Sequence, residues 1–272
     1  MNHLPEKAYK NAEFLNSPAA RQIRIVCEME EPRVRFKEEG VENTIVFFGS
    51  ARIHSAETSK ANLEKVQSRI AAEGEYEGSA RDLHKAEAGV RLVKYYDQTR
   101  ELARRFTKWS MEREERSYYI CSGGGPGIME ASNRGAADVP GGKSVGLGIS
   151  LPFEQGVNQW VTPELAFEFH YFFTRKYWFL YLCKGLVVFP GGFGTMDELF
   201  ETLTLVQTGK IRKKLPVVLF GKAYWDKILN LEAMADFGTI SPGDTDLFYT
   251  TDDVDDAFNY LTAELDSVTQ SF

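Results

Sequence analysis

The sequence predicts an α/β fold in which helices cover both faces of a parallel β-sheet. Short runs of β-branched, aromatic and aliphatic residues alternate along the chain with longer segments in which apolar residues recur at helical spacing. The short runs are apolar at consecutive positions and are bounded by glycine or proline, which is typical of strands buried on both faces of a sheet. This order of elements favours a Rossmann-like, doubly wound sheet.

Five buried strands are expected, and the longer segments are expected to form helices. The strands lie at residues 44–50 (TIVFFGS), 117–125 (SYYICSGGG), 144–150 (SVGLGIS), 185–192 (GLVVFPGG) and 215–221 (LPVVLFG). The helices lie at residues 86–116, 127–138, 172–183, 195–209, 224–238 and 252–265. In the fourth of these helices, the hydroxyl of Thr195 can act as the N-terminal cap.

The chain is expected to form one domain with an added arm. Residues 1–43 are polar and charged and show no strand alternation, so they predict an N-terminal arm that is helical or irregular. Residues 44–272 are expected to form a single Rossmann-like domain. A polar insertion at about residues 54–84 follows the first strand and has room for one helix.

The composition excludes several classes of protein. The chain has 32 Lys and Arg residues against 39 Asp and Glu residues, a formal net charge of −7. Because the basic residues are scattered, this argues against a general binder of nucleic acid or of acidic membranes, but leaves room for one anionic ligand. Cys27, Cys121 and Cys183 lie far apart, so we expect buried, reduced thiols rather than a zinc site or a disulfide framework. With no apolar signal core and no stretch long enough to cross a bilayer, the protein is expected to be cytoplasmic.

Three glycine-bearing turns follow predicted strands: FFGSAR at residues 47–52, CSGGGPGIMEAS at 121–132 and FPGGFGTMDE at 189–198. Ligands of parallel α/β sheets bind at the carboxyl ends of the strands, where bare turns let backbone amides approach closely. In the third turn the amides of residues 192–195 would be free at the positive end of a helix, which favours a phosphate or a carboxylate. Tight packing between strand and helix is the alternative explanation of the glycines. The turns match neither a Walker loop nor the dinucleotide-binding fingerprint.

Charged side chains accompany the third turn. Glu198 lies one helical turn beyond it, so its carboxylate could reach the sugar of a nucleotide whose phosphate occupies the turn. The neighbouring Asp197 is explained by the helix dipole alone. Arg175 and Lys176 stand in the aromatic segment FFTRKYW, where they either contact a phosphate or a purine or extend to solvent from the edge of a packed helix. The aromatic residues around them either stack on a base or belong to the core: Tyr171, Phe172, Phe173 and Trp178.

Four segments resemble, in the same order, the motifs of the Lonely Guy family, the cytokinin-activating phosphoribohydrolases that were formerly described as lysine decarboxylases. PGGFGTMDE at 190–198 is similar to the family signature PGGxGTxxE, and TRK at 174–176 is similar to its Arg-Lys pair. SGGGPGIMEASNRGA at 122–136 resembles its glycine-rich turn, and FFGSAR resembles the end of its first strand. The resemblance covers about residues 44–222, and the arm, the insertion and GIMEAS depart from the pattern of the plant members.

The resemblance implies that residues 44–272 form a nucleotide-binding domain. This domain would hydrolyse the N-glycosidic bond of AMP or N6-substituted AMP, releasing the free base and ribose 5-phosphate. Arg175 and Glu198 would be the catalytic residues, without a metal or cofactor. The protein would form a homodimer or a dimer-based oligomer and bind a small-molecule nucleoside monophosphate rather than nucleic acid or a membrane. The implied substrate-binding residues are Ser50, Gly123, Gly124, Gly125, Met129, Lys176, Gly191, Gly192, Gly194 and Thr195.

In the catalytic interpretation, Glu198 holds the ribose hydroxyls or orients a water molecule while positive charge develops at the anomeric carbon. Arg175 anchors the nucleotide and offsets negative charge on the departing base. Three other functions stay open on the residues alone: a non-catalytic protein that senses a nucleotide, a carrier of a phosphorylated metabolite, and a lysine decarboxylase. The last would need a lysine that holds pyridoxal phosphate, and the sequence offers none in a suitable setting.

Overall fold

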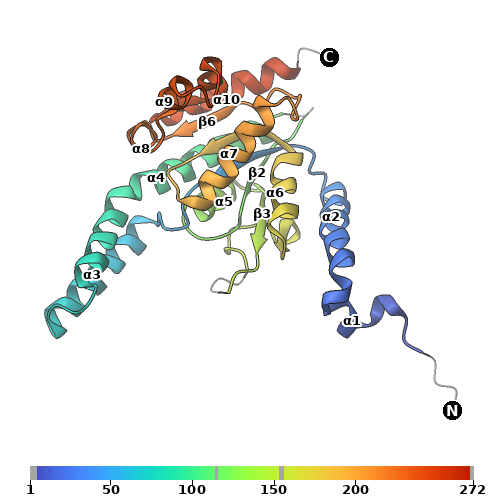
Figure 1. Ribbon diagram of the computed structural model, residues 1–272, viewed down its shortest axis with the longest axis horizontal. Coiled ribbons are helices and arrows are strands. Elements are labelled where there is room, and N and C mark those ends of the chain that lie inside the picture. Colours follow the sequence, from blue (N-terminus) through green and yellow to red (C-terminus); the bar gives the residue numbers. More distant parts are fainter. Residues whose placement is uncertain (1–4, 114–115, 153–155, 270–272) are drawn as a thin grey trace.

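The computed structural model describes residues 5–113, 116–152 and 156–269, and a seven-stranded sheet lies at its centre (Figure 1). All neighbouring strands pair in parallel, in the order β4-β3-β2-β1-β5-β6-β7. The predicted α/β class with a doubly wound parallel sheet is therefore confirmed. The strands are β1 (Thr44–Phe48), β2 (Tyr119–Ser122), β3 (Ser144–Ile149), β4 (Ala166–Phe169), β5 (Cys183–Val188), β6 (Val217–Phe220) and β7 (Tyr249–Thr251).

The two strands at the edges of the sheet were not expected from the sequence. β4 and β7 are only 4 and 3 residues long, and Glu168 in β4 is exposed. An edge strand pairs on one side only and can present polar side chains to water. Neither segment therefore carries the continuous apolar run that identifies the five inner strands.

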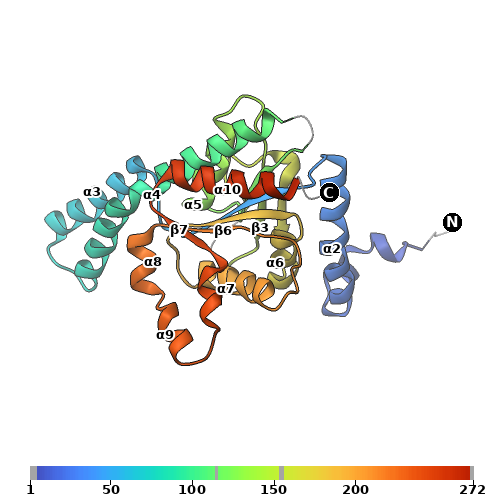
Figure 2. The same cartoon turned by 90° about the horizontal axis from the view of Figure 1, so that it is seen from above.

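Helices cover both faces of the sheet (Figure 2). One core forms between the sheet and α4, α5 and α10, and the other lies between the sheet and α2, α6, α7 and α8. The α-helices are α1 (Ala12–Asn16), α2 (Arg21–Glu38), α3 (Ala56–Glu73), α4 (Ser79–Met111), α5 (Ile128–Ala137), α6 (Phe172–Tyr181), α7 (Phe193–Gln207), α8 (Lys222–Ile228), α9 (Leu231–Asp236) and α10 (Val254–Thr269). Short 3₁₀ helices are η1 (Ala8–Lys10), η2 (Pro18–Ala20), η3 (Pro163–Leu165) and η4 (Pro242–Leu247).

The N-terminal cap predicted for α7 is wrong. The helix begins at Phe193, and Gly192 is the cap residue, without a side-chain hydrogen bond. Thr195 is therefore the third residue of the helix, where its hydroxyl cannot serve as the N-cap. The glycine-rich segment itself adopts helical geometry, which moves the start of the helix and its free amides toward the strand.

The helix predicted over residues 224–238 divides into α8 and α9. The backbone is extended at Leu229, and the side chain of Asn230 accepts a hydrogen bond from the amide of Ala233 at 3.0 Å. An asparagine that caps a helix favours a new start there, which the apolar spacing alone does not reveal.

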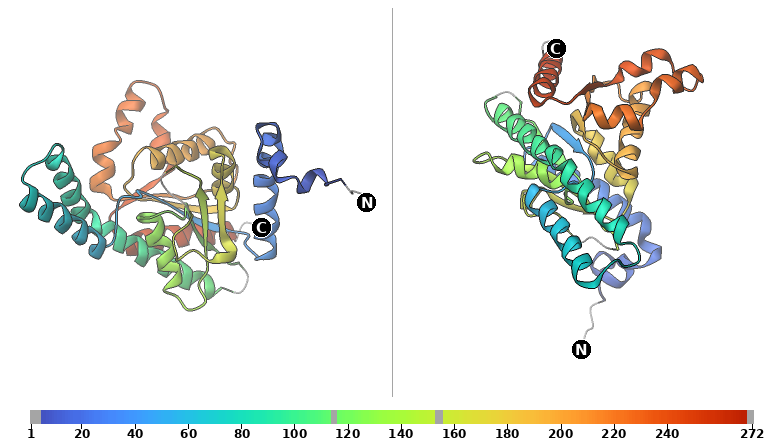
Figure 3. Two further views of the ribbon diagram at one scale, coloured as in Figure 1. Left: turned by 90° about the horizontal axis from the view of Figure 1, so that it is seen from below. Right: turned by 90° about the vertical axis from the view of Figure 1, so that its left-hand side faces the viewer.

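The insertion contributes more helix than expected. It contains α3 and the first turns of α4, which together form a hairpin that projects from the sheet (Figures 1 and 3). On the opposite side of the molecule, the arm lays α2 beside α6. The indole nitrogen of Trp178 donates to the carbonyl of Glu28 at 2.9 Å, and Phe36 packs on Phe167 and Trp178 with ring centroids 4.7 and 5.5 Å apart.

The three cysteines are free thiols. Cys121 and Cys183 are buried as expected, but Cys27 is exposed, because it lies on a solvent-facing side of α2. Across the described ranges, no group of His, Cys, Asp or Glu residues is arranged to hold a metal ion. Among the helices described in these ranges, none combines the length and the apolar character that crossing a bilayer requires.

Candidate active site

The glycine turn after β5 lies where the strand order reverses. From the central pair β1–β5 the chain adds strands outward in both directions, and ligands of doubly wound sheets bind at that point, beyond the carboxyl ends of the strands. The amide of Ser50, which follows β1, donates to the carbonyl of Pro190 at 3.0 Å. The hydroxyl of Tyr224 donates to the carbonyl of Gly191 at 2.6 Å. The turn is thus held from two sides.

The backbone amides of residues 192–195, which we call the amide turn, are available to a ligand. They belong to the N-cap and first turn of α7, and none of them donates a hydrogen bond to any residue in the described ranges. The positive end of a helix dipole lies at the same place and stabilises a bound anion by about 0.3–1 kcal/mol. The amide turn therefore has the properties of a phosphate or carboxylate site.

The three glycines that follow β5, at positions 191, 192 and 194, differ in what surrounds them. A Cβ atom at Gly191 would overlap the side chain of Thr195, so close packing explains this glycine. A Cβ atom at Gly192 or at Gly194 would meet nothing within 4 Å, and neither residue has a positive φ. Packing and backbone strain thus leave Gly192 and Gly194 unexplained. Gly192 is the N-cap residue of α7, a position where glycine is among the favoured residues, and the bare backbone at Gly192 and Gly194 also permits the close approach of a ligand.

Arg175 projects from α6 into a buried position beside the turn after β2. Its Nε donates to the carbonyl of Leu147 at 2.6 Å, and its guanidinium lies 4.9 Å from the ring centroid of Phe179. A side chain at Gly123 would overlap the guanidinium, so that glycine makes room for the arginine. Burial lowers the pKa of Arg175, which makes this an arginine whose charge is poorly solvated and available to an anionic group.

Glu198 on α7 faces Arg175, with Oε1 at 3.7 Å from Nη1. Burial raises the pKa of Glu198 to about 7, and the attraction of Arg175 only partly opposes this effect. The opposition is incomplete because the two groups are too far apart for a hydrogen bond and the Nε of Arg175 is bound elsewhere. The Glu198 side chain keeps 16% of its surface exposed, so a ligand can reach it. A carboxyl group with a pKa near neutrality is suited to proton transfer or to orienting water.

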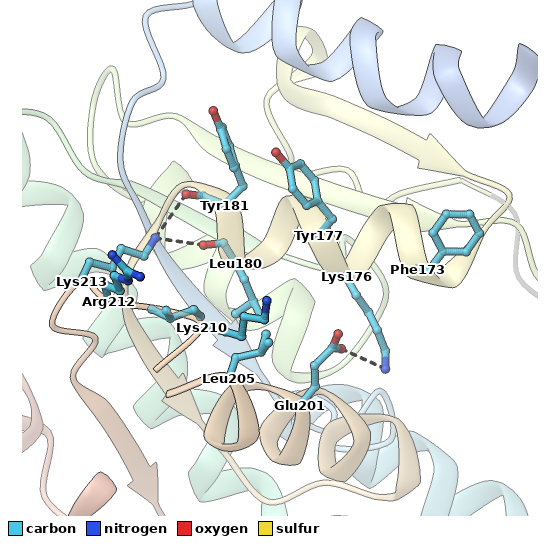
Figure 4. A pocket seen from close by; sticks show the side chains of 11 residues that line it. Phe173, Lys176, Tyr177, Leu180, Tyr181, Glu201, Leu205, Lys210, Arg212 and Lys213 are labelled. Atoms are coloured by element: carbon cyan, nitrogen blue, oxygen red, sulfur yellow. Dashed lines mark hydrogen bonds and ion pairs between the residues drawn. The ribbon is translucent and has the colours of Figure 1, made fainter. Parts of the chain in front are cut away.

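Lys176 does not join this pair. Its ammonium group binds Asp197 at 2.7 Å and Glu201 at 3.0 Å, and it lies at the rim of a pocket of about 560 Å³ between α6 and α7 (Figure 4). Consecutive residues of a helix point in directions about 100° apart, so Arg175 enters the core while Lys176 stays at the surface. The structure thus separates the two cations that are adjacent in the sequence.

The glycine turn after β2 is held by polar groups that the sequence interpretation missed. Gly124 has a φ of 70°, and its amide donates to the hydroxyl of Ser122 at 3.1 Å. The side-chain amide of Asn158 donates to the carbonyls of Gly124 and Gly125 at 2.9 and 3.0 Å and to the side-chain oxygen of Asn133 at 3.0 Å. In the sequence, this network is indicated by the place of Asn133 among positions of the helical pattern that the structure shows to be buried in α5.

The remaining predicted contacts lie around the same turns. The carbonyl of Ser50 accepts a hydrogen bond from the amide of Ile128 at 3.1 Å, which links the turns after β1 and β2. The sulfur of Met129 is 2.7 Å from the position that a Cβ atom at Gly123 would take, so Met129 lies beside Arg175. Ser50, Gly123 and Met129 are therefore close to the site, through backbone or packing contacts.

The aromatic residues near Arg175 divide between core and surface. Trp178 is buried, whereas Phe172 and Phe173 are each 55% exposed. Phe193, within the amide turn, is 96% exposed, and the sequence interpretation had assigned it no role. An aromatic side chain beside free amides is in a position to cover a bound ligand.

Comparisons with known proteins find similarity both by sequence and by structure. No curated protein matches the chain. The structure of the molybdenum cofactor binding protein from the phototrophic bacterium Rippkaea orientalis matches with a TM-score of 0.40 and 14% sequence identity, over 61% of this chain and 87% of that chain. The sequence profile of a family described as "Possible lysine decarboxylase" matches residues 129–261. That match includes Arg175, Glu198 and the amide turn, so over this segment the chain is similar to that family.

Proposed function

We propose that this protein hydrolyses the N-glycosidic bond of AMP or an N6-substituted AMP, and that it is a phosphoribohydrolase of the Lonely Guy type. The observation that carries the proposal is the amide turn. Its amides make no hydrogen bond to the described residues, Gly192 and Gly194 border open space, and one helical turn later lies a largely buried glutamate whose pKa is raised to about 7. The similarity of residues 129–261 to the family described as "Possible lysine decarboxylase" supports it, because Lonely Guy proteins formerly carried that description.

The amide turn would bind the 5′-phosphate. Amides at a helix N-terminus donate to phosphate oxygens, and the helix dipole adds attraction for the negative charge. Glu198 is six residues after Gly192, on the same helix, so a bound phosphate brings the attached ribose toward the carboxylate. Binding at one end of the substrate thereby fixes the position of the bond to be broken.

Glu198 would act in its ionised form. Cleavage of a glycosidic bond develops positive charge at the anomeric carbon, which a carboxylate stabilises while it orients the ribose hydroxyls or an attacking water. Its burial keeps the carboxylate poorly solvated, so the developing charge attracts it more strongly than in water.

Arg175 would act on the departing base. Its guanidinium is always charged and has a planar set of donors, and Nη1 and Nη2 are not engaged by the Leu147 carbonyl. These donors can offset the negative charge that the purine acquires as the bond breaks. The oxygen of the attacking water would bond to the anomeric carbon as the bond to the base breaks, and the proton that the water gives up would pass to the base, which leaves as a neutral purine.

The decisive experiment is to incubate the protein with AMP and to separate the products by chromatography. The expected result is free adenine and ribose 5-phosphate in equal amounts. Glu198→Gln should slow adenine release by about 10² to 10⁴-fold, the range for loss of a general acid or base. The matched control is Asp197→Asn, which removes the adjacent carboxylate that binds Lys176 and should leave the rate within about threefold, because an exposed ion pair contributes little.

Release of adenine by Glu198→Gln at the wild-type rate would refute the assigned role. If AMP binds to the wild-type protein and no adenine is released, the site is a non-catalytic nucleotide-binding site, which is the alternative function.

A further inference from the structure

A second cavity adjoins the amide turn on the side of the α3–α4 hairpin. It has a volume of about 660 Å³ and lies between the hairpin and the carboxyl edge of the sheet. Ser50, Gly191 and Gly192 line it and also belong to the turns of the candidate active site. Arg175 and Glu198 are not among its lining residues. The cavity, which we call the hairpin pocket, therefore opens from the amide turn on a side other than that of the catalytic pair.

The hairpin pocket is positively charged in a chain whose net charge is −7. One acidic residue, Asp82, lines it, and it accepts a hydrogen bond from Tyr76 at 3.1 Å. The cationic lining residues are Arg52, Lys65, Arg69 and Lys85. Of these, Arg69 binds Glu73 at 3.0 Å, whereas the other three make no ion pair with any residue that the structure describes. Three uncompensated cations around one cavity favour an anionic occupant.

The inner face of the hairpin does not form a packed core. Of the 18 residues of α3, only Ser59 is buried. The residues that α3 and α4 turn toward the pocket are mostly small, polar or charged, including Asn62, Lys65, Ala86 and Gly89. A helix of this length normally buries an apolar stripe against its neighbour. The space between the hairpin and the backbone of Gly191 and Gly192 is therefore open to a ligand.

We propose that the hairpin pocket binds the distal phosphates of a nucleoside 5′-diphosphate or triphosphate whose first phosphate lies on the amide turn. The orientation of the nucleotide rests on the proposed function, in which the sugar lies toward Glu198. Because Gly191 and Gly192 border the pocket and Glu198 does not, a phosphate chain longer than one unit extends from the amide turn toward Arg52, Lys65 and Lys85. A nucleotide held in this way occupies the amide turn and competes with the monophosphate substrate.

The expected gain in affinity follows from the number of free cations. An exposed charge pair changes an equilibrium constant by about 1.5- to 5-fold, so three of them together should make ATP bind roughly 3- to 125-fold more tightly than AMP. Each of Arg52→Ala, Lys65→Ala and Lys85→Ala should weaken ATP binding about two- to fivefold and leave AMP binding unchanged. The preference for ATP should shrink in high salt, which screens exposed charges.

The test is calorimetric titration of AMP, ADP and ATP into the Glu198→Gln protein, in which turnover is expected to be slow, in a buffer with a chelator so that Mg²⁺ does not cover the phosphates. The triple variant Arg52→Ala, Lys65→Ala, Lys85→Ala should lose the preference for ATP. The matched control is Lys60→Ala, which removes a cation of α3 that is 79% exposed and does not line the pocket; it should change neither affinity. Equal affinities for AMP and ATP, or a triple variant that keeps the preference, would overturn the proposal.

Two further measurements separate this proposal from the proposed function. Tripolyphosphate, which has no sugar or base, should bind the wild-type protein and lose affinity in the triple variant. If tripolyphosphate behaves in this way while AMP yields no adenine, the pocket assignment is supported and the proposed phosphoribohydrolase activity is wrong. If AMP is cleaved but the affinities for ATP and tripolyphosphate do not depend on the three cations, the proposed activity is supported and the pocket assignment is wrong.

Discussion

The glycines of the candidate site can be distinguished by the atoms that an added Cβ would contact. Gly191 cannot take a Cβ atom because Thr195 occupies that space, and Gly123 cannot because Arg175 occupies it. Gly192 and Gly194 could take a Cβ atom without a clash, so packing does not explain why these two positions are glycine. This difference separates the glycines that packing requires from those that packing does not require.

Gly194→Ala should therefore separate stability from binding. Alanine is the better helix former, so the variant should be as stable as the wild type or more stable by up to about 1 kcal/mol. In the proposed binding mode its methyl group would lie in the path of the phosphate, so AMP affinity should fall at least about tenfold, equivalent to one hydrogen bond to a charged group. Thermal unfolding and calorimetric titration measure the two effects. Gly191→Ala is the contrasting variant and should be destabilised by about 1–3 kcal/mol because it overfills packed space. Unchanged AMP affinity in Gly194→Ala would contradict this account of the glycine.

The pKa of Glu198 predicts a pH dependence. Burial raises this pKa from the usual value of 4.5 to about 7, so the carboxyl group is protonated below that pH. If the carboxylate is the active form, kcat rises as the pH increases through about 7 and falls as the pH decreases through it. Saturating AMP should be used, because the second ionisation of a phosphate monoester, near pH 6, affects binding. An acid limb near pH 4.5 would show that burial does not control this group.

At the scale of elements, the N-terminal arm fixes the helix that carries Arg175. The carboxylate of Glu28 in α2 accepts hydrogen bonds from the amides of His170 and Tyr171 at 2.8 and 3.3 Å and from the hydroxyl of Thr174 at 2.6 Å. The N-cap residue of α6, Tyr171, supplies no side-chain cap of its own. Glu28 thus caps α6 from another element and holds the first turn of the helix in place.

Glu28→Ala should reduce activity by moving Arg175. Loss of a helix cap costs about 1 kcal/mol of stability, and a misplaced guanidinium should lower kcat several-fold with little change in KM for AMP. Glu28→Gln keeps an acceptor oxygen and should recover most of the activity, which a general loss of packing would not allow. The control is Glu30→Ala, which removes an exposed partner of Arg33 on the same helix. Equal kcat values for Glu28→Ala and the wild type would rule out a positioning role.

Elements with local sequence signals could be predicted, whereas contacts between distant segments could not. The five inner strands and the start of each glycine turn could be predicted, because continuous apolar runs and glycines are local signals. The resemblance to the Lonely Guy family implied that Arg175 and Glu198 share a site, and the structure places the two side chains 3.7 Å apart. The cap by Glu28 could not be predicted, because it joins residues more than 140 positions apart. The hairpin was also missed in part, because α3 buries only Ser59 and so shows little apolar spacing.

At the scale of the molecule, two additions to the sheet flank one site. The arm contacts α6 on one side, and the hairpin borders the amide turn on the other (Figure 3). The first holds Arg175 in position, and the second supplies the cations of the hairpin pocket. The expected homodimer stays a prediction. The exposed aromatic side chains of α6 are the surface to examine first in light-scattering measurements, since four of them gather on one helix: Phe172, Phe173, Tyr177 and Tyr181.

The most direct measurement is a titration of AMP into isotopically labelled Glu198→Gln protein, followed by the amide resonances of Gly192, Gly194 and the residues between and after them. If the bare turn holds the phosphate, the resonances of residues 192–195 move furthest and saturate together, and the same shifts occur with ribose 5-phosphate. If these resonances stay in place while AMP binds elsewhere on the protein, the turn does not bind phosphate and the proposed mechanism is wrong.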